Sequence, residues 1–418
     1  MRDIRLLSGE GFEEYADIAF NAYPGFQIAT EEGRQRLIDR LKEFQDIPVQ
    51  HIVGLYREGK LLGGMRLFDF RMNMLGIEVS AGGVGMVAVD LVHKKEHVAK
   101  EMLTYFHEHY KGQGANVVLL YPFKPGFYYA MGYGYGAKVS QYRFQPAALR
   151  KGLGKEHVRF LIADDKPALM DCYNRYQART HGMMIRYPPE WDGWFKNLGL
   201  QNRLVGYERD GRIEGYIFFK FHPRPVENLL RNDIVIQEFV YTSRAALAGL
   251  LEFLRTQADQ IDRIVLTTAD ETFQHLLTDP RNECQDLIPS VYHESNVQGV
   301  GLMVRILDVA GIFRDLAERN FNGQSCRLRL TARDSFFPEN DGSTLIHFEQ
   351  GRATLPEAGG HDVEVTLDIA EFSSLLMGVI GFRRLHLYGL AEISDESYLD
   401  TIQRIFAVEQ KPICMTAF

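Results

Sequence analysis

The chain has 418 residues, of which 45% are hydrophobic and 24% charged, and its formal net charge is −8. At roughly 150 residues per domain this length predicts about three domains, and the composition excludes collagen-like, coiled-coil and disordered proteins. Nucleic-acid-binding proteins usually carry a basic excess, so no nucleic-acid partner is expected. No apolar run reaches the roughly 18 residues of a membrane span, so no membrane partner is expected either.

Cysteine spacing and the start of the chain bear on the cellular compartment. The four cysteines lie far apart and form no C-x-x-C pair: Cys172, Cys284, Cys326 and Cys414. Such spacing favours a reducing compartment over a disulfide framework or a structural zinc site. The first ten residues contain no apolar stretch long enough for a secretory signal. We therefore expect a cytoplasmic protein.

The chain opens with helical sequence and continues with a hairpin. Helices are predicted over Gly11–Ala22 and Glu31–Phe44. Strands follow at His51–Tyr56 and Leu61–Phe70, and Gly59 between them supplies the positive φ that a tight turn needs.

A long strand, a helix and a buried strand complete this first unit. The long strand covers Ile77–Val89, and the buried one is the fully apolar Val117–Leu120. In the helix between them apolar residues recur every four positions, which draws one apolar stripe down its length. That stripe consists of Val98, Met102, Phe106 and Tyr110.

The same order of elements recurs later in the chain. Val53–Gly63 matches Val205–Gly215 without a gap, 152 residues further on. At the same offset the strand end Val87–Val89 falls on Phe239–Tyr241. A helix and a second strand follow in both copies, and helical sequence precedes both. Four elements repeated in one order predict a duplicated domain.

From about residue 297 the pattern changes to a third, α+β domain. Its predicted strands are Gly301–Ile306, Cys326–Leu330, Thr344–Phe348 and Val363–Leu367. Its predicted helices are Val309–Glu318, Ile369–Val379 and Ser397–Ala407. The predicted domains are therefore residues 1–150, 151–296 and 297–418, in a mixed α/β and α+β fold class.

A basic loop between a strand and a helix is the first candidate binding site. A helix start leaves backbone N–H groups unpaired and carries partial positive charge, and two lysines add to it here. This combination predicts a pyrophosphate cradle. Its candidate residues are Lys94, Lys95, Glu96, His97, Val98 and Ala99. The alternative is an ordinary solvated helix start, because lysines are common on protein surfaces.

The second candidate is a segment rich in glycine and aromatic residues, Gly126–Gly136. Its glycines allow close backbone approach, and a tyrosine hydroxyl can donate a proton. The alternative for most of its five aromatic residues is packing at a domain edge.

The first candidate resembles the phosphate-binding region of the GNAT-type (GCN5-related) N-acetyltransferases. In that family a V-A-V strand precedes a turn of the form [RQ]-x-x-G-x-[GA]. The strand here is Val87, Ala88 and Val89, whose backbone N–H groups the resemblance assigns to the acetyl carbonyl. His97 stands where the family has the glycine of the turn, and Ala99 takes its last small position.

The second candidate resembles the family's Y-x-x-x-G-[FY] motif, which brings a tyrosine to the thiol of coenzyme A. Here the motif runs from Tyr128 to Tyr133, with Gly132 at its glycine. The resemblance therefore implies Tyr128, and not Tyr129, as the proton donor to the departing thiolate.

Duplication, length and an apolar chain end resemble one subfamily, the enhanced intracellular survival (Eis) acetyltransferases. There two GNAT units precede a domain resembling sterol carrier proteins, and the resemblance covers essentially the whole chain. It implies acetyl-CoA as the donor, an amine as the small-molecule acceptor, possible aminoglycoside substrates, and the C-terminal carboxylate of Phe418 as the base. It also implies a homo-oligomer, with a hexamer as the family's form.

Three further expectations concern the rest of the chain. The second unit lacks the paired lysines and the tyrosine motif, so we expect a degenerate copy. His93 and His97 lie one helical turn apart without a third ligand, so no metal is expected. The third domain carries apolar residues that could line a lipid tunnel or fill an ordinary core: Phe336, Phe337, Phe348, Phe372, Leu375, Leu376 and Phe382.

Two other functions stay open at this point. The acceptor could be a peptide or protein lysine or a polyamine, and pocket width and acidity would decide between these. The chain could also be a non-catalytic protein that binds coenzyme A or lipid, with His97 as a sign of lost catalysis.

Overall fold

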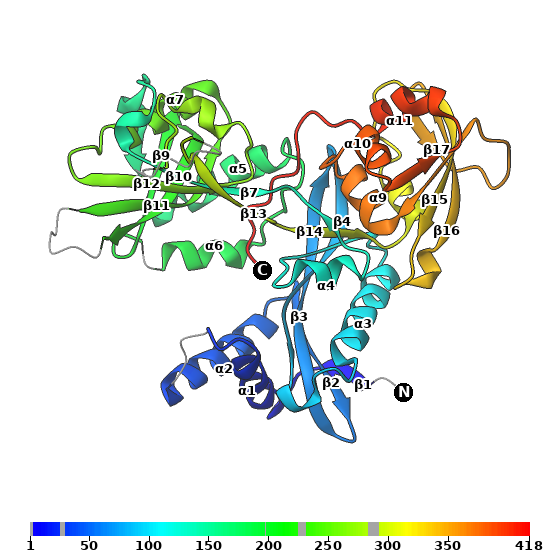
Figure 1. Cartoon of the computed structure of the whole chain (residues 1–418). Helices are drawn as coiled ribbons and strands as arrows, with labels where there is room; N and C mark the ends of the chain where they lie inside the picture. Colours follow the sequence, from blue (N-terminus) through cyan, green and yellow to red (C-terminus); the bar gives the residue numbers. More distant parts are fainter. Residues whose placement is uncertain (1–2, 26–29, 197, 225–230, 283–291) are drawn as a thin grey trace. The chain divides into compact units, whose positions relative to one another are not determined.

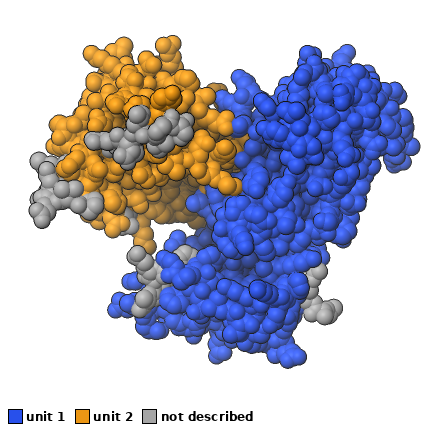
Figure 2. All heavy atoms as spheres, in the orientation of Figure 1, with its two compact units in different colours: residues 1–136, 302–411, 417–418 blue, residues 137–301, 412–416 orange. Residues whose placement is uncertain are grey.

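The computed structural model describes residues 3–25, 30–196, 198–224, 231–282 and 292–418 (Figure 1). The chain divides into two compact units, coloured in Figure 2. Unit 1 consists of residues 1–136, 302–411 and 417–418, and unit 2 of residues 137–301 and 412–416. Cys284 lies outside the described residues. No helix in the described ranges combines the length and apolar composition needed to cross a membrane.

Unit 1 contains a seven-stranded sheet in the order β1-β2-β3-β4-β5-β14-β6. Its strands are β1 (Asp3–Leu6), β2 (Gln50–Arg57), β3 (Lys60–Met74), β4 (Ile77–Val89), β5 (Val117–Leu120), β6 (Gly134–Tyr135) and β14 (Met303–Ile306). The hairpin of β2 and β3 and the long strand β4 occur where the sequence predicts them. β14 comes from a distant part of the chain and pairs antiparallel with both β5 and β6.

The turn between β2 and β3 explains why this hairpin is visible in the sequence. Arg57 pairs with Lys60, which leaves a two-residue turn. Glu58 and Gly59 both have positive φ, 51° and 81°, as a type I′ turn requires. This turn matches the right-handed twist of the strands and so fixes their register.

Helices cover both faces of this sheet (Figure 1). α1 (Gly11–Ala22) and α2 (Glu31–Gln45) pack into one apolar cluster with Leu61 and Ala88. α3 (Val98–Gly112) packs into another with Leu62 and Met65, and its predicted stripe is buried there. Neighbouring residues of one strand thus enter opposite cores, as the two-residue period of a strand requires.

β4 extends beyond the end of β5. The two strands run parallel and pair only from Ala81 with Val117 to Val84 with Leu120. β4 then continues alone on that side to Val89, and its register against β3 shifts between Gly64 and Arg66. Such a bulge bends a strand and interrupts its pairing. From residue 85 to residue 89, the backbone groups of β4 that do not pair with β3 therefore have no partner on β5.

Unit 2 contains a second seven-stranded sheet in the order β13-β7-β12-β11-β10-β9-β8. Its strands are β7 (Val139–Phe144), β8 (Val158–Phe160), β9 (Asn202–Arg209), β10 (Arg212–Pro223), β11 (Asn232–Tyr241), β12 (Ile261–Thr268) and β13 (Asn296–Gly299). Its helices are α5 (Lys166–Gln177), α6 (Pro188–Phe195) and α7 (Arg244–Arg255). α5 and α6 are the helical sequence expected ahead of the second hairpin.

The predicted duplication appears in the backbone of the second hairpin. Asp210 and Gly211 repeat the positive φ values of the first turn, at 52° and 74°. The register of β9 and β10 shifts between Ile213 and Gly215, and that of β2 and β3 shifts at the equivalent positions Leu61 and Gly63. The copies differ after β11, because α7 begins at Arg244 with Ser243 as its cap. The residues aligned with the first unit's basic loop are therefore helical.

The remaining part of unit 1 is a five-stranded sheet in the order β17-β16-β15-β18-β19 with short helices. Its strands are β15 (Cys326–Arg333), β16 (Gly342–Glu349), β17 (Arg352–Thr354), β18 (Val363–Asp368) and β19 (Ala391–Ile393). Its helices are α8 (Val309–Asp315), α9 (Ile369–Leu376), α10 (Phe382–Leu387) and α11 (Leu399–Ile405). Of the apolar residues that could line a tunnel, all but Phe336 are buried, and Phe336 and Phe337 pack against the ring of His107 on α3.

The predicted domain boundaries stay a prediction. β7 lies within the predicted first domain and belongs to unit 2, while β14 lies within the predicted third domain and completes the first sheet.

Candidate active site

The basic loop joins β4 to α3 and is exposed. Asp90 begins it by capping a short 3-10 turn, Leu91–His93, with its side chain accepting from the amide of Val92 at 3.2 Å. Lys94 and Lys95 are exposed, and neither has an ion-pair partner among the described residues. Both ammonium groups are therefore available to an anion beside the first turn of α3.

His97 adopts a backbone conformation that glycine adopts most readily. It is the residue before α3, with φ 62° and ψ 12°, which lies in the left-handed region. That region is uncommon for residues other than glycine, although histidine is among those that tolerate it best. The turn therefore keeps a glycine-like backbone, and the imidazole is exposed rather than packed into the loop.

The other residues predicted for this loop have different environments in the structure. Glu96 contacts His93 at 3.1 Å and Arg57 at 3.4 Å, so its carboxylate ties the loop to the β2–β3 hairpin. Val98 is 1% exposed and anchors the start of α3 in the core, while Ala99 is half-buried. The sequence-based prediction grouped these residues as one cradle, and the structure gives them different contacts.

Two tyrosines hold the bulged end of β4. The hydroxyl of Tyr15 donates to the carbonyl of Met86, and that of Tyr23 donates to the carbonyl of Val87 at 2.8 Å. Ala88 is buried and Val89 half-buried in the continuing strand. With these two carbonyl groups engaged by tyrosine hydroxyls, the strand end has a fixed orientation.

Phe418 lies on β3 and β4 within unit 1. Its ring contacts Phe68, Phe70 and Tyr121, with centroids 5.4, 4.9 and 5.2 Å away. A Cβ atom on Gly85 would stand 3.0 Å from the carboxyl carbon of Phe418. The glycine therefore makes room for the terminal carboxylate just beyond Val84, the last residue of β4 that pairs with β5.

Tyr128 lies in the short helix α4 (Pro125–Tyr129) and is 3% exposed. Its ring packs edge-on against Phe127 and Tyr133, at 5.2 and 6.0 Å. Burial raises its pKa well above the usual value, and electrostatic interaction with Tyr23 raises it further. Its hydroxyl is therefore protonated at neutral pH. It has no hydrogen-bond partner among the described residues, so it is free to donate to a ligand.

Tyr129, its neighbour, is engaged elsewhere. Its hydroxyl donates to Glu371 on α9, and its ring stacks on Tyr135 at 5.5 Å. Burial is the main reason that the pKa of Tyr129 is raised, and the hydrogen bond to Glu371 raises it further. The two adjacent tyrosines therefore differ in whether the hydroxyl is free to act on a ligand.

Sequence reasoning missed several residues that shape this region: Tyr15, Tyr23, Phe68, Phe70, Gly85 and Tyr121. They come from four separate places, namely α1 with its C-cap, β3, β4 and the residue after β5, and form no local motif. The one local signal is the run of small residues from Ser80 to Gly85, because glycines inside a strand often mark a close approach. Within the described ranges no group of three His, Cys, Asp or Glu side chains could hold a metal ion.

Comparison with family models divides the chain in the predicted order. Residues 3–136 and residues 182–306 each match a model described as an acetyltransferase (GNAT) domain. Residues 314–415 match a model described as a sterol carrier protein domain.

Similar proteins match nearly the whole chain. An uncharacterized N-acetyltransferase of Streptomyces avermitilis is 25% identical over 405 residues, which cover 93% of this chain and 92% of that protein. A GCN5-related N-acetyltransferase from Anabaena variabilis has a TM-score of 0.83 at 18% identity, and Eis1 from Mycobacterium abscessus 0.77 at 18%. Both structural matches cover 100% of each chain, and they show a common fold.

Proposed function

Because the chain belongs to the GNAT acetyltransferases, with the tandem arrangement predicted from its resemblance to the Eis type, we propose that it transfers acetyl from acetyl-CoA to an amine. The observation that carries the proposal is the terminal carboxylate of Phe418 at Gly85, in the opening between β4 and β5. A base there would meet a substrate beside the unpaired edge of β4.

The donor would bind across that opening. Lys94 and Lys95 and the free N–H groups of the first turn of α3 suit the pyrophosphate of acetyl-CoA. The backbone N–H groups of Val87–Val89 would hold the thioester carbonyl and stabilise the oxyanion that develops on it. The hydrogen bonds from Tyr15 and Tyr23 would keep this strand end in place.

Acetyl transfer then needs a base and an acid. The Phe418 carboxylate accepts a proton from the ammonium of the acceptor, and the free amine attacks the thioester carbon. The nitrogen of the tetrahedral intermediate releases its second proton to water, the C–S bond breaks and the amide forms. Tyr128 donates its proton to the departing thiolate, and the proton held by the base restores it.

The ring contacts of Phe418 hold the chain end beside Gly85. An α-carboxyl group in water titrates at about pH 3.5 and is a weak base, so the proposed role calls for an acceptor ammonium whose own pKa is lowered.

The acceptor is the least constrained part of the proposal. We take aminoglycosides as the first class to test, because the net charge of −8 suits polycationic amines. Polyamines and lysine peptides are the other classes.

Release of free thiol from acetyl-CoA, measured against neomycin, spermine and a lysine peptide, tests the proposal. Turnover with at least one amine, with mass spectrometry showing one added acetyl group per modified amine, is the expected result. Binding of acetyl-CoA without turnover of any amine would favour a non-catalytic protein that binds coenzyme A.

A further inference from the structure

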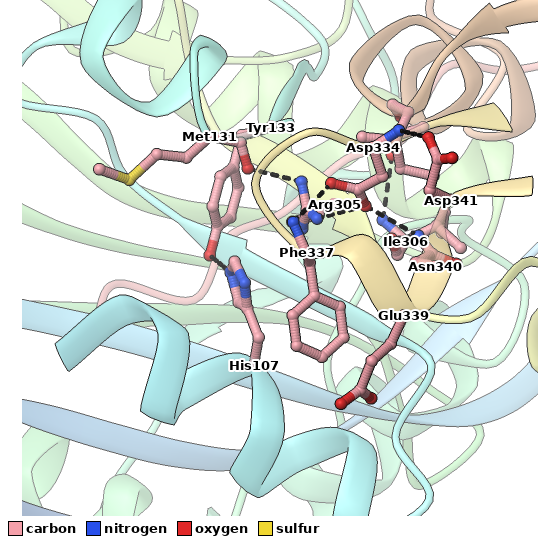
Figure 3. Close-up of polar contacts among 12 residues, drawn as sticks. His107, Met131, Tyr133, Arg305, Ile306, Asp334, Phe337, Glu339, Asn340 and Asp341 are labelled. Carbon is pink, nitrogen blue, oxygen red and sulfur yellow. Dashed lines mark hydrogen bonds and ion pairs between the residues drawn. The ribbon is translucent and has the colours of Figure 1, made fainter. Parts of the chain in front are cut away.

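A buried arginine lies under the turn that follows Tyr128 (Figure 3). Arg305 is on β14 and is 0% exposed. Its Nη1 donates to the carbonyl of Met131 at 2.5 Å, and its Nη2 to the carboxylate of Asp334 at 2.5 Å. One guanidinium group thus joins the tyrosine segment to a loop that precedes β16.

The turn itself is built around the arginine. Gly132 has φ 79°, and a Cβ atom there would stand 1.6 Å from Nη1 of Arg305. The glycine of the Y-x-x-x-G-Y motif therefore has a local reason, because a side chain at that position would displace the guanidinium. Tyr133, the next residue, is anchored by its hydroxyl, 2.9 Å from Nε2 of His107.

The same turn carries the backbone of Tyr128. Its carbonyl accepts from the amides of Met131 at 2.9 Å and Tyr133 at 3.2 Å. α4 has only five residues, and so short a helix has little stability of its own. The position of the tyrosine hydroxyl therefore depends on what holds the turn.

Asp334 is itself fixed on every side. Its carboxylate accepts from the amide of Phe337 at 2.9 Å and from the side-chain amide of Asn340 at 3.1 Å. Its own amide donates to Asp341 at 2.7 Å. A buried ion pair often adds little net stability compared with apolar packing, so the expected contribution of this pair is to geometry.

We infer that Arg305 is a positioning residue for Tyr128: backed by Asp334, it holds the carbonyl of Met131 and thereby sets where the acid's hydroxyl stands. This rests on the proposed function, in which Tyr128 protonates the thiolate. It also gives the loop before β16, outside the first acetyltransferase unit, a part in the reaction.

A double-mutant cycle of Arg305→Lys with Tyr128→Phe tests the inference in the full-length chain. Lysine keeps the charge but lacks the planar fork that bridges two acceptors. With acetyl-CoA and the amine of the panel that turns over fastest, kcat should fall about 10- to 100-fold, the scale of a small misplacement. KM for acetyl-CoA should change by less than about threefold, because no donor contact is lost.

The decisive comparison is made in the Tyr128→Phe background. There Arg305→Lys should change kcat by less than about twofold, because residues that act through one group are not additive. The full loss in both backgrounds would overturn the inference and leave the proposed function standing. If Tyr128→Phe alone leaves kcat unchanged, it is the acid role within the proposed function that fails.

A second variant and a control separate positioning from general damage. Asp334→Asn leaves the arginine in place and removes the charge that orients it, so it should show the same non-additivity if Arg305→Lys does not fold. Arg263→Lys is the control, since Arg263 pairs with Asp233 at 2.6 Å in unit 2. It should lower the melting temperature at most and leave kcat unchanged.

Amide hydrogen exchange addresses the same inference without turnover. In Arg305→Lys the peptide covering residues 128–133 should exchange faster than in the wild type, while peptides of α3 and β5 should not. Unchanged exchange at 128–133 would overturn the inference even if no amine were acetylated.

Discussion

Two adjacent tyrosines give a matched test of the acid. Tyr128→Phe keeps the ring that packs against Tyr133 and removes only the hydroxyl. We expect kcat to fall about 10²- to 10⁴-fold, the usual contribution of general acid–base catalysis, with little change in KM for acetyl-CoA. Because burial raises the pKa of Tyr128, the donor stays protonated and this group should cause no loss of kcat up to about pH 9.

Tyr129→Phe is the control for that measurement. It removes the hydrogen bond to Glu371, so it should lower thermal stability slightly and change kcat by less than about threefold. Equal losses in the two variants would contradict the assignment of Tyr128.

Gly85 gives a second test at a single position. Gly85→Val should push the terminal carboxylate away from β4, since a Cβ atom would already stand 3.0 Å from the carboxyl carbon. We expect kcat to fall at least about tenfold while acetyl-CoA still binds, measured by steady-state kinetics and calorimetry. Gly299→Val is the matched control, because a Cβ atom there meets nothing within 4 Å. An unchanged kcat in Gly85→Val would contradict the proposed role of the carboxylate in the reaction.

Single residues were predictable only where a motif marks them. Tyr128 precedes Gly132 at a recognisable spacing, so the sequence could single it out from Tyr129. Tyr15 and Phe70 have no such spacing, because they reach the site through tertiary packing of α1 and through the register of β3.

The basic loop can be tested as one element. Replacing Lys94 and Lys95 with alanine should raise KM for acetyl-CoA and make it less sensitive to salt, since two charges near the phosphates would be lost. Lys155 and Lys196, two exposed lysines of unit 2, give the matched control pair. An unchanged KM in the first variant would place the donor elsewhere.

The loop before α3 can be returned to the family pattern by placing glycine at position 97. His97→Gly should leave KM for acetyl-CoA equal or lower, because glycine adopts the observed φ of 62° without strain. The melting temperature, measured beside KM, reports whether the loop's stability changes with it. A large rise in KM would show that the imidazole contacts the donor.

Most elements were predictable because their local sequence pattern agrees with the way they pack in the fold. The four-residue period of α3 and the Glu58–Gly59 turn are local signals, and both appear as predicted. α10 is missed because its six residues are too few to show a period. The places of β7 and β14 were not predictable either, since a short strand, whether alternating like β7 or mostly apolar like β14, carries no sign of which sheet it joins.

At the scale of the whole chain, the second copy lacks, between β11 and α7, the counterpart of the first copy's basic loop. α7 follows β11 almost directly, and Ala246 in its first turn is 0% exposed. Calorimetry should therefore find one bound coenzyme A per chain. Ala246→Ser should lower stability, because it places a hydroxyl in the core, without changing the affinity for acetyl-CoA. Two bound coenzyme A molecules per chain would contradict the degenerate assignment.

The chain end belongs to both units and gives the last test. Residues 412–416 belong to unit 2, where the amide of Ile413 donates to the carbonyl of His181 at 2.8 Å and Pro412 packs at Gly182. Residues 417–418 belong to unit 1, where Phe418 lies among Phe68, Phe70 and Tyr121. Within unit 1, the ring contacts hold Phe418 at its place on β3 and β4.

Appending three glycines after Phe418 should therefore abolish turnover, because the carboxylate moves away from Gly85 with the new chain end. Deleting Phe418 should do the same, and both proteins should still melt cooperatively and bind acetyl-CoA. Phe418→Leu is the matched variant: it keeps the carboxylate and loses the ring contacts, so its loss of kcat should stay within about tenfold. A frayed end would tolerate all three changes. Full activity in the extended protein would refute the carboxylate as base, and the proton would then have to leave the ammonium through a side chain of the first unit or through water.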